Sequence, residues 1–261
     1  MSSWNPDQYE RFRDERSQPF FDLLDLVTPI PGGRAIDLGC GTGELTRLMH
    51  ERVGARTTVG LDNSETMLAR AGEHAVPGLR FKLGTILRFA PRTKYDLIFS
   101  NAALQWVPGH DHLLARLAAS LAPAGQLAVQ VPANHDHPSH LIAHEVAAEE
   151  PFLSALGGYV RSVPVEPPEW YAAKLYALGF ERQTVRLQVY PHVLDGAEGV
   201  IEWVKGTLLT DYRARLTPAE YEAYLARYRE RLLPVLGDAR PYFYGFKRIL
   251  MWGRMPDAGD R

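Results

Sequence analysis

A glycine-rich loop next to acidic residues is the segment of this sequence best suited to hold a ligand. Residues 36–43 read IDLGCGTG, and a helical pattern begins directly afterwards at Glu44. Glycine lets the chain turn sharply and lets a ligand approach the backbone closely. A dinucleotide fingerprint would need its third glycine where Glu44 stands, and a carboxylate at a helix start would repel a pyrophosphate. The loop therefore favours a ligand without phosphate groups.

A second acid follows the loop at a distance that suits a nucleoside. Asp62 comes 19 residues after Gly43 and ends another apolar segment. A carboxylate in that place can accept hydrogen bonds from both hydroxyls of a ribose. The plain alternative is a glycine-rich turn followed by an aspartate that caps a helix. The order strand, turn, helix favours the ligand site over that alternative.

The first half of the chain contains the elements that must position these residues. Short apolar segments alternate with helical patterns, as in a parallel sheet with crossover helices on both faces. The expected strands are residues 34–38, 57–61, 79–83, 95–99 and 126–131, and the expected helices are 44–53, 64–74 and 112–121. The loop then follows the first strand, and Asp62 ends the second.

The second half is less regular, and we expect two further strands there. These are residues 180–190 and 245–252, with helices expected at 169–178, 197–209 and 219–233. The complete prediction is an α/β fold with a doubly wound, mostly parallel seven-stranded sheet. We expect a single domain over residues 1–261, with a cofactor-binding half at 30–132. Insertions at 133–170 and 196–244 are expected to form a helical substrate cover.

Composition excludes several classes of protein. Twenty-nine basic and 31 acidic residues give a net charge of -2, so the chain lacks the positive field of a general nucleic-acid binder. The single cysteine, Cys40, excludes an intrachain disulfide and a cysteine-rich zinc module. No apolar run reaches the roughly 18 residues of a membrane span, and the first residues do not resemble a secretory signal. We expect a cytoplasmic protein without membrane or nucleic-acid partners.

Four histidines cluster around Pro138 and raise the question of a metal site. They are His135, His137, His140 and His144. No cysteine or clearly placed carboxylate joins them, so we expect no metal and a polar loop that leads into a helix. His140 could instead contact a substrate.

The glycine loop resembles motif I of class I S-adenosylmethionine-dependent methyltransferases. In that family the acid before the loop lies near the amino group of the methionine part, and Asp37 matches it. The family often has an acid near the adenine where this chain has Thr85, so a neutral or backbone contact is implied here. The cofactor-binding residues that the resemblance implies are Asp37, Gly39, Cys40, Gly41, Gly43, Asp62, Asn63, Met67, Thr85, Ile86, Asn101, Ala102 and Trp106.

Further segments narrow the resemblance to the trans-aconitate 2-methyltransferase family. The similar segments are residues 3–9, 15–19, 101–108, 129–134, 138–140, 202–207 and 246–248, so that the resemblance runs along nearly the whole chain. It implies a Rossmann-like methyltransferase fold. It also implies formation of a methyl ester on a carboxylate of trans-aconitate, with S-adenosylmethionine as cofactor and S-adenosylhomocysteine as product.

Such a reaction makes modest chemical demands on the protein. A carboxylate nucleophile has an ordinary pKa near 4 and is already ionised at pH 7, so we expect no general base among the catalytic residues. Positioning and removal of water would drive the displacement. The remaining carboxylates need cations, for which arginine is best suited. The expected substrate-binding residues are Tyr9, Arg16, His140, Arg161, Tyr244 and Arg248.

Three other functions remain open at this point. The chain could methylate another small-molecule acceptor that needs a base, and such an enzyme would show strongly pH-dependent turnover. It could be a regulator that binds S-adenosylmethionine without catalysis. A dehydrogenase is the weakest option, because Glu44 replaces the required glycine. The sequence does not fix the oligomeric state.

Overall fold

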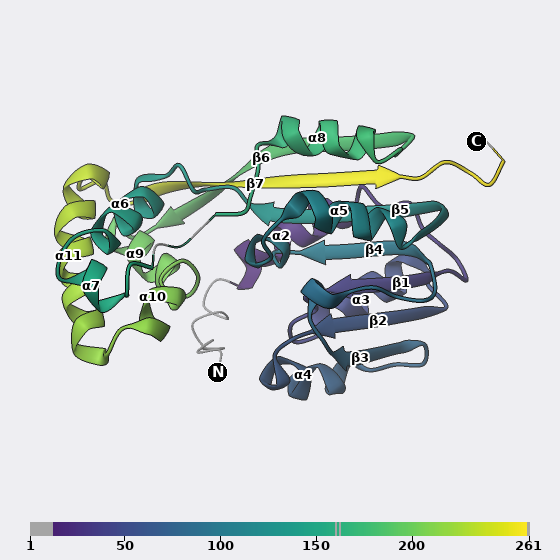
Figure 1. The fold of residues 1–261 in the computed structure, drawn as a ribbon, viewed down its shortest axis with the longest axis horizontal. Coiled ribbons are helices and arrows are strands. Elements are labelled where there is room, and N and C mark those ends of the chain that lie inside the picture. The colour runs from purple at the N-terminus through teal and green to yellow at the C-terminus, as the bar shows by residue number, and fades with distance from the viewer. Residues whose placement is uncertain (1–12, 160, 162, 260–261) are drawn as a thin grey trace. The chain divides into compact units, whose positions relative to one another are not determined.

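The computed structural model describes residues 13–159, 161 and 163–259, and these divide into two compact units (Figure 1). The first unit consists mainly of residues 133–163 and 189–247. The second consists of residues 16–132, 164–188 and 248 onward.

The sheet has seven strands in the order β3-β2-β1-β4-β5-β7-β6. Their bounds are β1 Arg34–Leu38, β2 Thr57–Asp62, β3 Leu79–Leu83, β4 Tyr95–Asn101, β5 Leu121–Pro132, β6 Arg182–Leu194 and β7 Tyr242–Arg254. Strands β1 to β5 pair in parallel, and β7 runs antiparallel to β5. The predicted α/β class and the mostly parallel seven-stranded sheet are confirmed.

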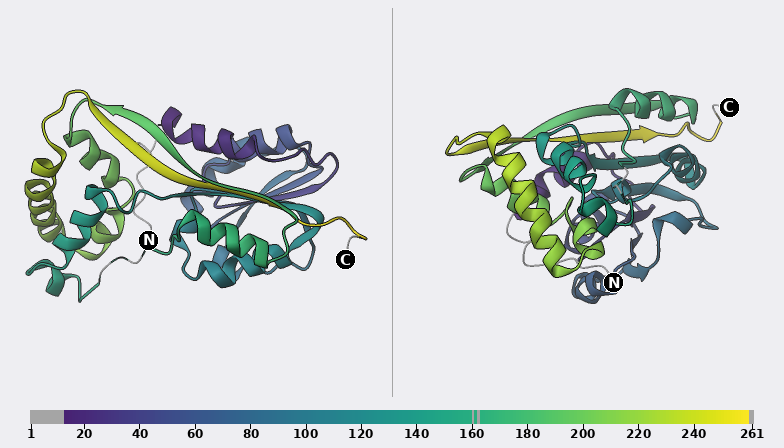
Figure 2. Two further views of the ribbon diagram at one scale, coloured as in Figure 1. Left: turned by 90° about the horizontal axis from the view of Figure 1, so that it is seen from above. Right: turned by 60° about the vertical axis from the view of Figure 1, so that its left-hand side comes forward.

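Helices cover both faces of the parallel part of the sheet, which agrees with the burial of four of the five residues of β1 and four of the seven residues of β4. Helices α2 (Arg13–Leu24) and α3 (Glu44–Val53) lie on one face, and α5 (His110–Ala119) and α8 (Pro168–Ala177) lie on the other (Figure 2). A short helix α4 (Glu65–Ala71) connects β2 to β3 through a 3-10 turn at Gly72–His74.

The strand order places a switch point between β1 and β4. From β1 the chain builds outward through β2 and β3, and it then returns to place β4 on the other side of β1. Crossover connections therefore leave β1 and β4 in opposite directions, which opens a crevice at their carboxyl ends. Ligands of open α/β sheets bind in such a crevice.

The first unit has its own apolar core, built from helices α6 (Pro138–Ala147), α7 (Phe152–Ala155), α9 (Glu198–Lys205), α10 (Thr210–Arg215) and α11 (Pro218–Leu236). The stripe of Tyr221, Leu225, Tyr228 and Leu232 on α11 faces this core and is buried, as packing requires. Helix α11 begins with a complete capping box, in which Thr217 and Glu220 each satisfy the other's backbone.

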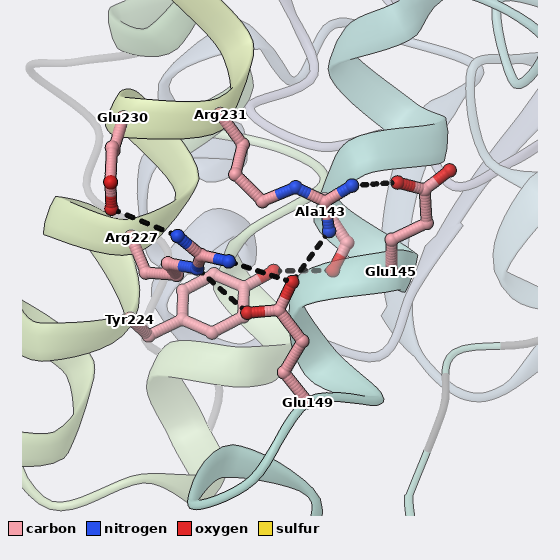
Figure 3. A network of polar contacts seen from close by, with 7 residues as sticks. All are labelled: Ala143, Glu145, Glu149, Tyr224, Arg227, Glu230 and Arg231. Carbon is pink, nitrogen blue, oxygen red and sulfur yellow. Dashed lines mark hydrogen bonds and ion pairs between the residues drawn. The ribbon is translucent and has the colours of Figure 1, made fainter.

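Polar contacts join α11 to α6 at the edge of that core (Figure 3). The buried hydroxyl of Tyr224 donates to the Ala143 carbonyl over 2.7 Å. Further out, Arg227 and Arg231 both bind the Glu149 carboxylate, with Nε–O and Nη1–O distances of 2.7 and 2.6 Å. The Arg227 hydrogen bond lowers the pKa of Glu149 below its usual value. These contacts fix α6 against α11 within the first unit.

Local predictions differ from the structure mainly in the second half of the chain. The helix expected at 197–209 ends earlier, at Lys205, because the chain turns at Gly206. A separate helix that was not predicted, α10, begins at Thr210, whose hydroxyl donates to the Thr207 carbonyl. Strand β6 continues four residues beyond the predicted end at Tyr190. Helix α6 is the helix into which the polar loop around Pro138 was expected to lead, although no bounds were predicted for it.

Candidate active site

The glycine loop lies directly after β1, where the strand order opens the crevice. Gly39, Gly41 and Gly43 all have left-handed backbone angles, with φ of 83°, 54° and 80°. A Cβ on Gly39 would meet Ala103 Cβ at 2.2 Å, and one on Gly43 would meet the Phe81 ring at 2.6 Å. A Cβ on Gly41 would meet nothing within 4 Å. Packing therefore demands two of the glycines, while the middle one borders open space that a ligand can enter.

Asp62, at the end of β2, holds the loop in place. Its Oδ2 accepts a hydrogen bond from Gly41 N, and its Oδ1 accepts one from Ser64 N, both at 2.9 Å. The carboxylate oxygens have further lone pairs, which can accept hydrogen bonds from a ligand. The sequence suggested a ligand contact or, as the alternative, a helix-capping aspartate, and the hydrogen bond from Gly41 N is a structural role that neither interpretation included.

Asp37, the acid before the loop, is buried and carries only one side-chain hydrogen bond that the structure describes. Thr46 Oγ1 donates to Asp37 Oδ2 over 2.6 Å from the first half of α3. Burial raises the pKa of Asp37 to about 7, the Thr46 hydrogen bond lowers it, and the nearby Asp62 raises it further. A cation bound beside Asp37 would remove this penalty, so the position suits the ammonium group of an amino acid.

The other predicted cofactor residues lie at the carboxyl ends of β2, β3 and β4. Asn63 follows β2, and Met67 N donates to the Ser64 side chain at the start of α4. Thr85 caps a 3-10 helix through a hydrogen bond from Leu87 N, and Ile86 is the first residue of that helix. Their contacts with a cofactor stay a prediction.

The segment after β4 has the features of a ligand-facing turn. Ala102 has a φ of 53°, which is rare outside glycine, and its amide donates to the Gln130 carbonyl. The buried Oδ1 of Asn101 has no hydrogen-bond partner among the described residues. Buried acceptors are normally satisfied, so this oxygen suits a donor on a ligand. Trp106 is 39% exposed and closes the segment.

Cys40 lies inside the loop but is poorly suited to act as a nucleophile. It is buried, and burial together with the nearby Asp37 and Asp62 raises the pKa of its thiol. A raised pKa keeps the sulfur protonated at neutral pH.

The predicted substrate residues fall in different parts of the chain. Arg248 lies in the second unit, where it is buried on β7 opposite Pro132 and donates to Gln130 Oε1 over 3.5 Å. Since Gln130 is paired with Asn101 across β4 and β5, Arg248 stands at the same edge of the sheet as the cofactor residues. The ordinary alternative to a substrate-binding role was a solvent-exposed arginine on the surface. Arg248 is buried, so that alternative is excluded.

His140, Arg161 and Tyr244 belong to the first unit. Burial and the charge of Arg161 lower the pKa of His140 to about 3, so its ring is neutral. Tyr244 is fully buried, and its hydroxyl accepts a hydrogen bond from Asn134 Nδ2 over 3.2 Å. Core packing against His137 and Trp203 accounts for its position. Tyr9 lies outside the described residues, as does the side chain of Arg16.

No group of three or more histidine, cysteine or acidic side chains within the described residues is arranged to hold a metal ion. Within the same part of the chain, no helix is long and apolar enough to cross a membrane.

The raised pKa of Asp37 predicts how stability depends on pH. The folded protein holds a proton on Asp37 between about pH 4 and pH 7 that the unfolded chain releases, so this group makes stability fall as pH rises through that window. Asp37→Asn removes the ionisation and should stabilise the ligand-free protein more at pH 8 than at pH 5, by on the order of 1–3 kcal/mol. Urea unfolding at the two pH values measures the difference. An equal effect at both would show that the pKa of Asp37 is ordinary.

Comparison with known proteins places these features in a family. A family described as a methyltransferase domain matches residues 35–125. The fold resembles the YcgJ protein of Bacillus subtilis, with a TM-score of 0.61 and 15% identity over 92% of this chain and 99% of that one. It also resembles a Haemonchus contortus phosphoethanolamine N-methyltransferase solved with S-adenosylmethionine. The TM-score is 0.55 and the identity 17%, over 92% of this chain and 53% of that one. At these identities the structures show the fold alone, which is the Rossmann-like methyltransferase fold.

Sequence relatives are much closer. The chain is 46% identical over 261 residues to the trans-aconitate 2-methyltransferase of Deinococcus radiodurans, covering 98% of this chain and 99% of that one. It is 42% identical over 258 residues to that of Variovorax paradoxus, covering 98% and 97%. The glycine loop, the two acids and identity along the full length together show that this chain belongs to the trans-aconitate 2-methyltransferase family.

Proposed function

We propose that this protein transfers the methyl group of S-adenosylmethionine to a carboxylate of trans-aconitate, which gives a monomethyl ester. The proposed substrate rests on the 46% sequence identity to the trans-aconitate 2-methyltransferase of Deinococcus radiodurans, which extends over almost the full length of both chains. Similarity along the whole chain includes the segments outside the cofactor-binding half, where a substrate is distinguished from other acceptors.

The residues present fit the cofactor. Three features of the site each match a group that S-adenosylmethionine offers. They are the open space beside Gly41, the buried acceptor Asn101 Oδ1, and the carboxyl group of Asp37, whose charged form burial disfavours. Asp37 would bind the amino group, and Asp62 would accept hydrogen bonds from the ribose. When bound, the cofactor supplies a methyl group activated by a sulfonium ion.

The work left to the protein is binding, orientation and exclusion of water. The attacking carboxylate needs no base, because it is ionised at pH 7. A buried cation such as Arg248 can hold an anionic acceptor in register and replace the water that would otherwise solvate it. Proximity and desolvation of this kind can supply most of the lowering of the barrier for a displacement.

A transfer assay tests the proposed function. Purified protein is incubated with S-adenosylmethionine labelled in the methyl group and with a panel of di- and tricarboxylates, neutral esters serving as controls. We expect label on trans-aconitate that base hydrolysis releases, because an ester is base-labile, and none on the neutral analogues. Cofactor binding without transfer to any acid would overturn the substrate assignment and favour a binding protein without catalysis.

The role of Asp62 can be separated from that of an ordinary structural aspartate. Asp62→Ala should weaken binding of S-adenosylhomocysteine by roughly 1.5–3 kcal/mol, the value of hydrogen bonds to a charged group. Asp96→Ala is the matched control, because Asp96 also accepts a backbone hydrogen bond, from Arg34 N over 2.8 Å, but near the amino end of β4. Calorimetric titration measures both affinities. Equal losses in the two variants would mean that Asp62 acts only through the fold.

A further inference from the structure

Two glutamines are buried on the same face of β5, and their hydrogen bonds differ. For Gln126, both amide atoms have partners within the chain. Its Nε2 donates to the Thr28 carbonyl over 2.8 Å, and its Oε1 accepts from Thr28 N and from Trp252 Nε1, each over 2.9 Å. Gln126 is therefore satisfied by the protein itself, and its role is structural.

Gln130, four residues further along the strand, has a donor without a partner. Its side chain is completely buried, and its Oε1 accepts from Arg248 Nη1 over 3.5 Å. Its Nε2 is buried and has no hydrogen-bond partner among the described residues. Exchanging the two amide atoms would turn Nε2 toward the guanidinium, donor against donor, so Arg248 fixes the orientation of the amide. The unpartnered atom of Gln130 is thus the donor.

An unpartnered acceptor lies beside this donor. Asn101 on β4 is the register partner of Gln130, and neighbouring strands are about 4.8 Å apart. The buried Oδ1 of Asn101 has no partner among the described residues either, so the two amides do not satisfy each other. Leaving a buried donor and a buried acceptor unpaired is costly, and a ligand that offers an acceptor and a donor removes the cost.

The register of the sheet separates the Gln130 donor from the proposed site of the cofactor's amino group. Asp37 pairs with Phe99 across β1 and β4, and Phe99 pairs with Ala128 across β4 and β5. Gln130 therefore lies two strands from Asp37, roughly 10 Å across the sheet, and two residues beyond Ala128 toward the carboxyl end of β5. The amino and carboxylate groups of the cofactor share one carbon atom. The separation thus favours an acceptor on a second ligand over the cofactor's own carboxylate.

We propose that Gln130 Nε2 donates a hydrogen bond to a carboxylate oxygen of the acid substrate and thereby positions the acid. This inference rests on the proposed function for the identity of the acid. The residues that carry it, Asn101, Gln130 and Arg248, all belong to the second unit, and Arg248 is needed here only to orient the amide. An amide is neutral, so it binds a carboxylate less strongly than a cation does and leaves more electron density on the oxygen.

Substitution of the two glutamines by methionine tests the difference between them. Gln130→Met removes the donor and keeps the length of the side chain. We expect it to raise the KM for trans-aconitate roughly 10- to 100-fold, with a smaller effect on kcat, since one hydrogen bond to a charged group is lost. It should bind S-adenosylhomocysteine as the wild type does, which shows that it is folded. Gln126→Met is the matched control and should leave both values unchanged. An unchanged KM in Gln130→Met, or equal increases in the two variants, would overturn the proposal.

A double-mutant cycle distinguishes direct contact from an effect through Arg248. Gln130→Met is compared in the wild-type protein and in Arg248→Met, with kcat/KM for trans-aconitate as the measured quantity. If Gln130 contacts the acid, its substitution should still lower kcat/KM at least several-fold when Arg248 is replaced. Disappearance of the effect in that background would show that Gln130 only holds the arginine, which would overturn the contact.

Direct binding separates this inference from the proposed function. The side-chain amide signals of Gln130, assigned by their loss in Gln130→Met, are followed by NMR during addition of S-adenosylhomocysteine and then of trans-aconitate. We expect the larger shift in the second step, whether or not the acid is methylated, while the amide signals of Gln126 stay in place. A shift completed in the first step would assign the donor to the cofactor's carboxylate and overturn the substrate contact. Binding of both ligands without a shift would overturn it as well and spare the methyltransferase. Absence of both transfer and acid binding would overturn both proposals.

Discussion

The site depends on a carboxyl group that the fold buries beneath the glycine loop. Asp37 is the buried, second-last residue of β1, with Thr46 as its hydrogen-bond donor and a second acid, Asp62, close enough to raise its pKa. Two acids so close together, one of them removed from water, favour a positively charged ligand and reject a phosphate. The loop is held over this charge because Asp62 accepts the Gly41 amide. The choice of ligand and the shape of the loop therefore follow from the same pair of carboxylates.

Charge is arranged in the opposite sense where the acid substrate is expected to bind. Arg248 is buried on β7 in the second unit, at the same edge of the sheet as the predicted cofactor residues. Buried arginines are costly unless an anion compensates them. On the proposed function, the acids near the glycine loop would face a cationic cofactor and Arg248 an anionic acceptor, in a protein whose net charge is only -2. The composition alone could not reveal this arrangement, because the acidic and basic residues nearly cancel in the net charge.

The sequence predicts those parts of the protein that are set locally. Alternation of apolar strands and helices gives the sheet, and the glycine spacing gives the loop, because each depends on neighbouring residues. The break between α9 and α10 depends on a turn at Gly206 and Thr207 that helical periodicity does not reveal. Contacts between distant residues are beyond local patterns: His144 and Tyr212 lie 68 positions apart. The burial of Arg248 likewise depends on how β7 pairs with β5, and only family resemblance pointed to it.

The central claim is that the buried charge of Asp37 is completed by a cationic amino group, and the protons exchanged on binding test it most directly. S-adenosylhomocysteine is titrated calorimetrically in buffers of different ionisation enthalpy. If the pKa of Asp37 is about 7 in the free protein and falls on binding, release should approach about one proton at pH 6 and vanish by about pH 9. Asp37→Asn should abolish it. Binding at pH 6 without proton release would contradict the account.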